Sequence, residues 1–369
     1  MKNLGILALA AVSASAFANS ATIGALNTFG GGDGWLAPAE TNGWLDTANN
    51  TRGFAYNAAT GNLIVVSRTA GSVPAPNGPQ ARILNGATGF HDPTNPAHFL
   101  NQGSGIISGG TFTMSMVAAD RSGNIYVANL ATAVGSAFKV YKWAGEGAAA
   151  PTVAINQTGF TRAGDSLDLL DASGTVSISA GGTGYNNLVR FQNTGSGFGS
   201  GSVLSTGSSA FYRIGHTFAG SHDTFFGKQT GNGQVGQSGT LSGSSLLLAG
   251  MGGNLGADGT AAMDYAEING VKVLAVMDMN SSTVRIFNVN NPTAPLLMAT
   301  GNNTSGTLAP NTNATGQVKW GSINGGSATL YAMSSNQGIQ AFSVNVVPEP
   351  ATMAALGLGV AAMLRRRKK

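Results

Sequence analysis

The 369-residue chain contains no cysteine and very little charge. Without cysteine it has no disulfide bonds, thiolate nucleophiles or thiolate metal ligands. Charged residues make up 9% of the chain, against about 25% in an average soluble domain, while 42% of the residues are hydrophobic. The composition therefore excludes a highly charged, disordered chain and allows an ordinary hydrophobic core.

The central part of the chain also lacks an excess of basic residues. The whole chain carries a net charge of +4, but Lys2 and the run Arg365–Lys369 supply six of its 19 basic residues. Residues 19–347 hold 13 basic and 14 acidic residues. A body with a net charge of −1 has no polycationic surface to neutralise phosphates, so we expect no nucleic-acid binding.

A sustained helical period is missing as well, and this absence sets the fold class. Glycine accounts for 55 residues without a three-residue period, which excludes collagen. Asn-Gly and Asp-Gly dipeptides, which favour two-residue hairpin turns, recur along the chain. The longest body segment without Gly or Pro, residues 271–291, alternates like a strand. These features predict an all-β protein.

The N-terminus has the three parts of a secretory signal peptide. Lys2 supplies the positive charge, Leu4–Val12 is apolar, and Ala16 and Ala18 form a small-x-small cleavage site. We therefore expect residues 1–18 to be removed.

The C-terminus combines a short motif with a short apolar segment and a basic tail. Val347, Pro348, Glu349 and Pro350 precede the apolar stretch Ala351–Leu364, and five basic residues follow it. Fourteen helical residues span about 21 Å, short of a bilayer core of about 30 Å. Physical chemistry alone predicts a marginal, temporary membrane anchor.

These three parts, in this order, resemble the PEP-CTERM sorting signal of Gram-negative bacteria. The resemblance covers residues 347–369 and implies a short transmembrane helix with a basic tail. It further implies transient contact with an exosortase, a membrane-embedded cysteine protease that cuts near the triplet. The protein would then be exported across the inner membrane to the cell surface or beyond, in bacteria that also make exopolysaccharide and form a biofilm matrix. Membrane contact is expected only through this signal, before processing.

Between the two termini, strand–turn–strand units recur. Turn glycines at positions 123, 174, 270 and 325 are separated by 51, 96 and 55 residues, and the widest gap fits two units, one of them centred near Ser221. Another unit surrounds Gly61. A period of about 50 residues predicts a β-propeller of about six to seven blades over residues 19–346.

One turn adds a weak resemblance to this periodicity. Residues 120–127 resemble a turn common in several bacterial propeller families, which implies no activity. The alternatives are a β-helix or a two-sheet sandwich assembly. The glycine-rich segment 229–259 would be a flexible surface excursion or part of a glycine-rich solenoid.

A propeller leaves two open sheet edges unless its ends meet, and open edges promote aggregation. We therefore expect Ala21–Leu26 to pair beside Gln340–Val346 and to close the ring.

Few residues qualify as a catalytic or metal site. His91, His98, His216 and His222 would form one only if they converged in space, and we predict no metal, no cofactor and no catalytic residues. Asp165, Asp168 and Asp171 alternate faces along a strand, so they cannot all bind one ion. Asp278 and Asn280 are read as a polar turn rather than a calcium site.

Trp35 and Trp44 lie in a duplicated Gly-Trp-Leu motif and are the candidate ligand contacts, with core packing as the alternative. The sequence predicts a non-enzymatic scaffold or weak binder of neutral exopolysaccharide. The alternative is a secreted propeller enzyme, lactonase-like or glycan-cleaving, with or without a metal ion. A cluster of Asp, Asn and His at the mouth of a central channel would favour the enzyme.

Overall fold

The computed structural model describes residues 20–41, 43–68, 79–91, 98–182, 187–205, 212–228, 236–251, 255–256 and 259–347. Within these ranges the chain forms 24 strands and two short 3-10 helices, η1 (Gly30–Gly32) and η2 (Pro38–Glu40). None of the described helices is long and apolar enough to cross a membrane. Residues 1–18 and 348–369, which carry both terminal signals except Val347, lie outside the described residues.

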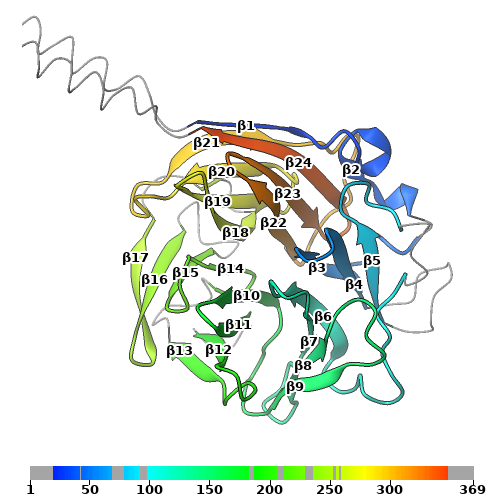
Figure 1. Ribbon diagram of the computed structural model, residues 1–369, viewed down its shortest axis with the longest axis vertical. Coiled ribbons are helices and arrows are strands. Elements are labelled where there is room, and N and C mark those ends of the chain that lie inside the picture. The colour runs from blue at the N-terminus through cyan, green and yellow to red at the C-terminus, as the bar shows by residue number, and fades with distance from the viewer. Residues whose placement is uncertain are drawn as a thin grey trace, which may run out of the picture.

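The strands follow one another as antiparallel meanders, which form six units in chain order (Figure 1). The first unit has three strands: β3 (Thr51–Asn57), β4 (Asn62–Ser67) and β5 (Gln80–Asn85). The second is β6 (Phe112–Ala119), β7 (Ile125–Leu130), β8 (Phe138–Trp143) and β9 (Thr152–Gln157). The third is β10 (Ser166–Ala172), β11 (Thr175–Gly181), β12 (Asn187–Asn193) and β13 (Ser202–Ser205).

The remaining units continue the pattern. The fourth is β14 (Gly215–Phe218), β15 (Thr224–Lys228), β16 (Gln237–Ser242) and β17 (Ser245–Gly250), joined to the third by a single parallel pair, Ser205 with Ser245. The fifth is β18 (Thr260–Ile268), β19 (Val271–Asp278), β20 (Val284–Asn288) and β21 (Leu296–Gly301). The sixth is β22 (Gly316–Asn324), β23 (Ser327–Ser334) and β24 (Gly338–Val347), completed by β1 (Ser20–Ala25) and β2 (Trp35–Leu36).

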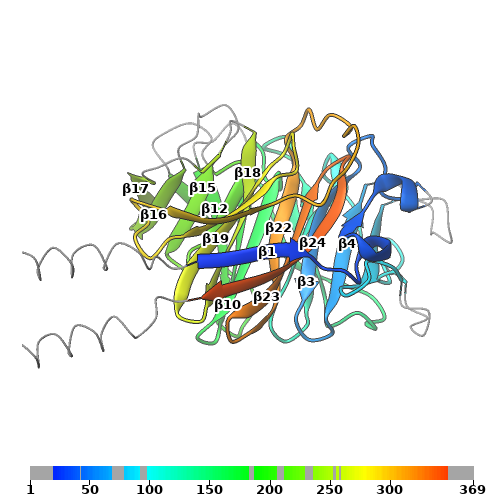
Figure 2. The same cartoon turned by 90° about the horizontal axis from the view of Figure 1, so that it is seen from above.

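The first strand of each unit belongs to a central ring. Each of β3, β6, β10, β14, β18 and β22 contacts the next, and β22 contacts β3, so the ring closes. Neighbouring inner strands approach each other closely at a glycine: a Cβ on Gly215 of β14 would lie 1.7 Å from the carbonyl oxygen of Ala261 on β18. The sheets are therefore arranged around a common axis, as in a propeller (Figures 1 and 2).

The hydrophobic core confirms this circular arrangement because it is divided into six clusters, each lying mainly between neighbouring units. Phe138 of the second unit, for example, stacks on Phe191 of the third with 5.7 Å between ring centroids. Phe54 of the first unit shares a cluster with Ile339 of the sixth. Apolar burial between sheets, which is the main favourable term in folding, thus acts all around the ring.

The turns within the units lie where the glycine spacing predicted them. In each unit, a turn joins the first strand to the second and contains a glycine with positive φ. This conformation is unfavourable for residues with a Cβ. These glycines are Gly61, Gly123, Gly174, Gly220, Gly270 and Gly325. The gap between Gly174 and Gly270 does contain an additional unit, as predicted.

The predicted ring closure is confirmed. β1 pairs antiparallel with β24, with Ala21 opposite Val346 and Ala25 opposite Phe342. The two strands lie side by side in both views (Figures 1 and 2). The sheet of the last unit therefore contains the first strand of the chain, so its edge at β24 is covered.

Part of the glycine-rich segment 229–259 belongs to the propeller-like arrangement. Its described part includes β16 and β17, the outer hairpin of the fourth unit. This described part is therefore a paired hairpin of the fourth unit and not part of a solenoid. Gly239 of β16 is buried, and a Cβ there would lie 2.7 Å from the Tyr212 hydroxyl, so this position requires the close approach that glycine allows.

Candidate functional site

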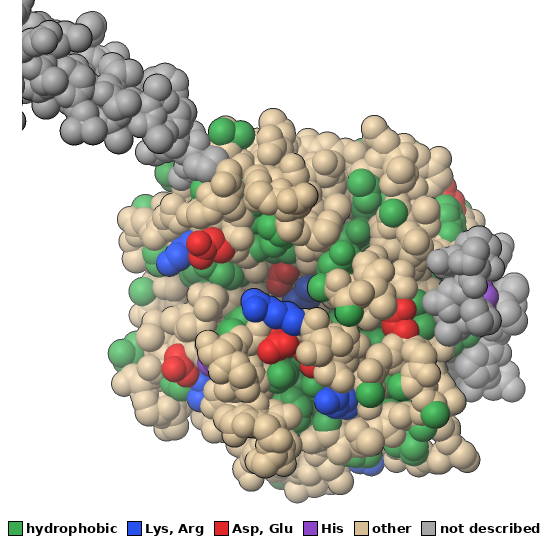
Figure 3. Space-filling model, viewed as in Figure 1, with side chains coloured by type: hydrophobic (Ala, Val, Ile, Leu, Met, Phe, Trp, Pro, Cys, Tyr) green, Lys and Arg blue, Asp and Glu red, His purple; other side chains and the backbone are tan. Residues whose placement is uncertain are grey.

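A cavity of about 800 Å³ opens at one end of the central ring. All six inner strands, or the turns that follow them, contribute to its wall. Figure 3 shows basic and acidic side chains gathered at the centre of this face, while most of the remaining surface is uncharged. The lining includes three basic residues (Arg121, Lys272, Lys319) and three acidic ones (Asp168, Asp264, Glu267). Among these described lining residues the formal charge is therefore zero.

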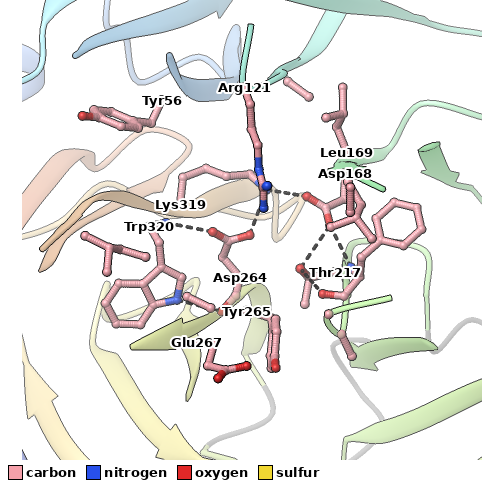
Figure 4. Close-up of a pocket in the computed structure, with 18 of the residues that line it drawn as sticks. Tyr56, Arg121, Asp168, Leu169, Thr217, Asp264, Tyr265, Glu267, Lys319 and Trp320 are labelled. Atoms are coloured by element: carbon pink, nitrogen blue, oxygen red, sulfur yellow. Dashed lines mark hydrogen bonds and ion pairs between the residues drawn. The ribbon is translucent and has the colours of Figure 1, made fainter. Parts of the chain in front are cut away.

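At the floor of the cavity, Lys319 of β22 lies between two carboxylates from other units (Figure 4). Its Nζ is 2.5 Å from Asp168 Oδ1 of β10 and 3.0 Å from Asp264 Oδ1 of β18. All three side chains are largely buried, with exposed fractions of 14%, 3% and 13%. The ion pairs thus connect three inner strands across the channel.

The second oxygen of each carboxylate also accepts hydrogen bonds. Asp264 Oδ2 accepts the backbone N–H of Trp320 at 2.8 Å. Asp168 Oδ2 accepts the backbone N–H of Phe218 at 2.8 Å and the Thr217 hydroxyl at 3.1 Å. Such contacts fix the orientation of buried carboxylates and offset the free energy that their burial costs.

The electrostatic environment of this group shifts two pKa values. Burial raises the pKa of Asp264 to about 6; Lys319 opposes the shift, and the neighbouring Asp168 adds to it. For Lys319, burial favours the neutral amine, but the two carboxylates outweigh this and raise the pKa above its ordinary value. The lysine is therefore charged at neutral pH, and Asp264 titrates nearer neutrality than an exposed aspartate.

The upper wall of the cavity combines aromatic and hydrogen-bonding groups. Tyr56 and Tyr265 are half-buried and line the cavity together with Ser221 and Thr224. Tyr56 stacks on Tyr331 with 5.8 Å between ring centroids, and Tyr265 packs at 6.0 Å from Phe226. Both rings are held from behind, so their free surface is presented at fixed positions to a ligand.

The histidines do not converge on this cavity, and among the described residues that line it none is histidine. His91 and His98 pack against each other in the first unit, with 4.6 Å between ring centroids. His216 is buried between the hydroxyls of Ser166 and Ser179, and burial lowers its pKa to about 4. His222 lies 3.0 Å from the carbonyl oxygen of Ala172.

The described residues also contain no group of three or more His, Asp or Glu side chains that could hold a metal ion. A cluster of Asp, Asn and His at the mouth of the channel would have favoured an enzyme. Of these three residue types, the described lining of the cavity contains only Asp168 and Asp264, and both are paired with Lys319. Asp278 forms a polar turn: its Oδ1 accepts the backbone N–H groups of Asn280 and Ser281.

The two candidate tryptophans lie away from this cavity. Trp44 is 9% exposed and belongs to the core cluster between the first and sixth units, with the Arg82 guanidinium 4.9 Å from its ring centroid. Trp35 is half-buried in β2, and its Nε1–H donates to the carbonyl oxygen of Gln337 at 2.8 Å. Trp44 is therefore a core residue, which was the alternative to ligand contact for the two tryptophans. Its ring packs here because the N-terminal segment folds over the junction that closes the ring.

The charged group at the cavity floor was not predicted from the sequence, although the sequence contains a signal for it. Asp168, Asp264 and Lys319 each precede the turn glycine of their unit by six residues. Equal offsets in equivalent strands place side chains at the same height on the same face. A charged residue at one offset in three units therefore indicates a cluster on the axis.

Comparison with known proteins identifies the C-terminal segment. Residues 346–368 match the PEP-CTERM protein-sorting motif. The described structure reaches this motif only at Val346 and Val347, the last residues of β24. The expected cleavage positions Ala16 and Ala18, and the triplet Pro348, Glu349 and Pro350, lie outside the described residues.

Solved structures show that the fold of the body is known. A DUF4623 family protein from Bacteroides eggerthii is similar at 16% identity and a TM-score of 0.65, covering 90% of this chain and 77% of that one. The major Malassezia sympodialis allergen Mala s 1 is similar at 12% identity and a TM-score of 0.51, covering 82% of this chain and 93% of that one.

At these identities the likeness concerns the fold alone. No curated protein matches the chain. The C-terminal motif indicates export across the inner membrane toward the cell surface. The chain thus carries the PEP-CTERM sorting signal of exosortase substrates behind a body whose sheets are arranged as in a propeller.

Proposed function

We propose that this chain is an exported six-bladed propeller that acts without catalysis at the cell surface or in the extracellular matrix, where it holds a neutral exopolysaccharide weakly in its central cavity. The observation that carries the proposal is the charge balance of the cavity, whose three basic and three acidic lining residues cancel. A neutral cavity in a body of net charge −1 offers no long-range attraction to a polyanion.

The size and chemistry of the cavity suit a short stretch of a sugar polymer. A volume of about 800 Å³ lies within the range of about 300–1,000 Å³ typical of small-molecule sites. Tyr56 and Tyr265 offer ring faces on which the apolar face of a sugar can stack. Arg121, Ser221 and Thr224 supply hydrogen-bond donors and acceptors for hydroxyl groups.

The binding proposal is tested with Tyr265→Ala and Phe90→Ala. Tyr265 lines the cavity, whereas Phe90 is an exposed aromatic residue (41%) outside its described lining and serves as the control. Loss of one stacking contact of about 1 kcal/mol weakens binding about fivefold.

Titration calorimetry with oligosaccharides cut from the producer's own polysaccharide should show this loss for Tyr265→Ala only. Equal affinities for both variants and the unchanged chain would place any binding elsewhere.

The processing steps form a separate part of the proposal. The sorting motif supports recognition by an exosortase, and we infer that the extracellular form lacks both residues 1–18 and the segment after the Pro-Glu-Pro triplet. Cleavage there would leave β24, which ends at Val347, paired with β1. Intact-mass measurement of protein from the culture medium tests this. A chain that retains Arg365–Lys369 would contradict it.

One observation favours the second candidate, a secreted hydrolase. Asp264 lies in a cavity, and burial raises its pKa to about 6, a value suited to a general acid or base. An assay of lactones, esters and glycosides, with and without a chelator, separates the two proposals. Hydrolysis that is lost in Asp264→Asn would establish the enzyme, and an inactive protein that still binds the polysaccharide would establish the binder.

A further inference from the structure

Four arginines gather at the end of the channel opposite the cavity. Arg52 lies at the start of β3, and Arg68 directly follows β4. Arg162 and Arg213 precede β10 and β14. Arg162 and Arg213 pair with Asp165, and Arg52 and Arg68 interact with it electrostatically. Asp165 precedes Asp168 of the cavity floor by three residues, or about 10 Å of extended strand. We call these four residues the arginine cluster.

Asp165, the carboxylate that the described residues place beside the arginine cluster, already forms two ion pairs. Arg162 donates to both oxygens of Asp165, each at 2.7 Å, and Arg213 Nε donates to Oδ2 at 3.1 Å. The carboxylate is 3% exposed, while the two arginines remain accessible at 26% and 30%. Asp165 thus neutralises one of four positive charges.

Arg52 and Arg68 form no ion pair with any residue that the structure describes. Arg52 Nε donates to the carbonyl oxygen of Asn49 at 2.9 Å. Arg68 Nη2 donates to the Ser115 hydroxyl at 2.8 Å, and its guanidinium carbon lies 3.7 Å from the ring centroid of Phe112.

Arg68 is nevertheless only 7% exposed, and its buried Nε has no hydrogen-bond partner. Burial, together with Arg52, lowers its pKa to about 9. Residues 69–78, which directly follow Arg68 in the sequence, contain no Asp or Glu.

We propose that the arginine cluster is a binding site for an oxyanion, the carboxylate, phosphate or sulfate group of a small ligand. A buried guanidinium without a counter-charge is unfavourable, and an anion that accepts its N–H groups relieves this. Planar guanidinium groups bind such oxyanions through paired, charge-assisted hydrogen bonds. This site lies at the other end of the channel from the proposed glycan cavity and does not depend on it.

The test measures anion-dependent thermal stabilisation of the full-length chain and of Arg52→Gln and Arg68→Gln. Inorganic phosphate, inorganic sulfate and a uronic-acid disaccharide are compared with chloride at equal ionic strength. Ligand binding to the folded state raises the melting temperature with concentration. Each substitution should weaken binding roughly ten- to hundredfold, as expected for the loss of a hydrogen bond to a charged group.

Arg190→Gln is the control, because Arg190 is paired with Asp223 outside the cluster. The basic tail is present in every variant, so differences between variants report the cluster alone. A response lost in Arg52→Gln and Arg68→Gln but kept in Arg190→Gln supports the proposal, and the active probe identifies the kind of oxyanion.

Two results would overturn the proposal: no response to any of the three probes, or a response that survives both cluster substitutions. Arg52→Gln should also raise the melting temperature without added anion, because it removes repulsion inside the cluster. This second readout uses Arg52, which is less buried than Arg68, and so keeps the test decisive should Arg68→Gln fail to fold.

Discussion

Replacing Lys319 by methionine removes the cation that neutralises two buried carboxylates. Its Nζ lies 2.5 Å from Asp168 and 3.0 Å from Asp264, so the variant leaves both carboxylates buried at the cavity floor without a counter-charge. Removing one partner of a buried ion pair costs about 3–5 kcal/mol. Native stabilities are about 5–15 kcal/mol, so a large part of the free energy of unfolding should disappear at pH 8.

The destabilisation should depend on pH in a defined direction. Burial already raises the pKa of Asp264 to about 6 in the unchanged chain, and losing Lys319 raises it further. A carboxyl group whose pKa is higher in the folded than in the unfolded state stabilises the fold when protonated, and loses this contribution as the pH rises through the folded-state pKa. Lowering the pH from 8 to 5 should therefore restore roughly 2–4 kcal/mol to the variant.

Urea unfolding followed by tryptophan fluorescence at both pH values measures this effect. Lys272→Met is the matched control, because Lys272 is an exposed lysine at the rim of the same cavity and should change stability by no more than about 0.5 kcal/mol. Equal destabilisation of Lys319→Met at pH 5 and pH 8, or destabilisation no larger than that of the control, would refute the reasoning.

Three further predictions concern the stability of the body. Gly215→Ala should destabilise the protein by about 3 kcal/mol, because its Cβ would lie 1.7 Å from a carbonyl oxygen of β18, whereas Gly174→Ala, in open space at positive φ, should cost only about 1 kcal/mol in urea unfolding. Deleting residues 21–25 should lower the melting temperature of the whole body and promote aggregation, measured by calorimetry and light scattering, because it uncovers the edge of β24. Asp120→Ala should cost about 2–4 kcal/mol, since the carboxylate accepts four hydrogen bonds, one of them from the buried Tyr126 hydroxyl, and Asp120→Asn should recover part of this in the same assay.

Much of the fold could be predicted because its signals are local. A tight turn between two strands needs a residue that tolerates positive φ, so Gly61, Gly123, Gly174, Gly270 and Gly325 mark the units in the sequence itself. The closing pair of β1 and β24 followed from a general requirement, since a ring of sheets with unpaired ends exposes two edges.

The charged group at the cavity floor depends on information that no single segment contains. Asp168, Asp264 and Lys319 are separated by 96 and 55 residues and acquire a shared environment only when the ring closes. Comparing residues at the same offset from the turn glycines could have found them. No such periodicity distinguishes Trp44 as a core residue, because its burial comes from the irregular N-terminal segment packing over the first unit.

Hydrogen–deuterium exchange of the full-length chain, with and without oligosaccharides from the producer's exopolysaccharide, tests the central claim most directly. The cavity is lined by the turn-side ends of the inner strands, including Asp168–Ala172 of β10, Asp264–Glu267 of β18 and Lys319–Ile323 of β22. The account predicts that added oligosaccharide slows exchange at these segments and not in the outer strands β9, β13, β17 and β21. Unchanged exchange at the inner strands, or protection confined to the outer strands, would contradict it.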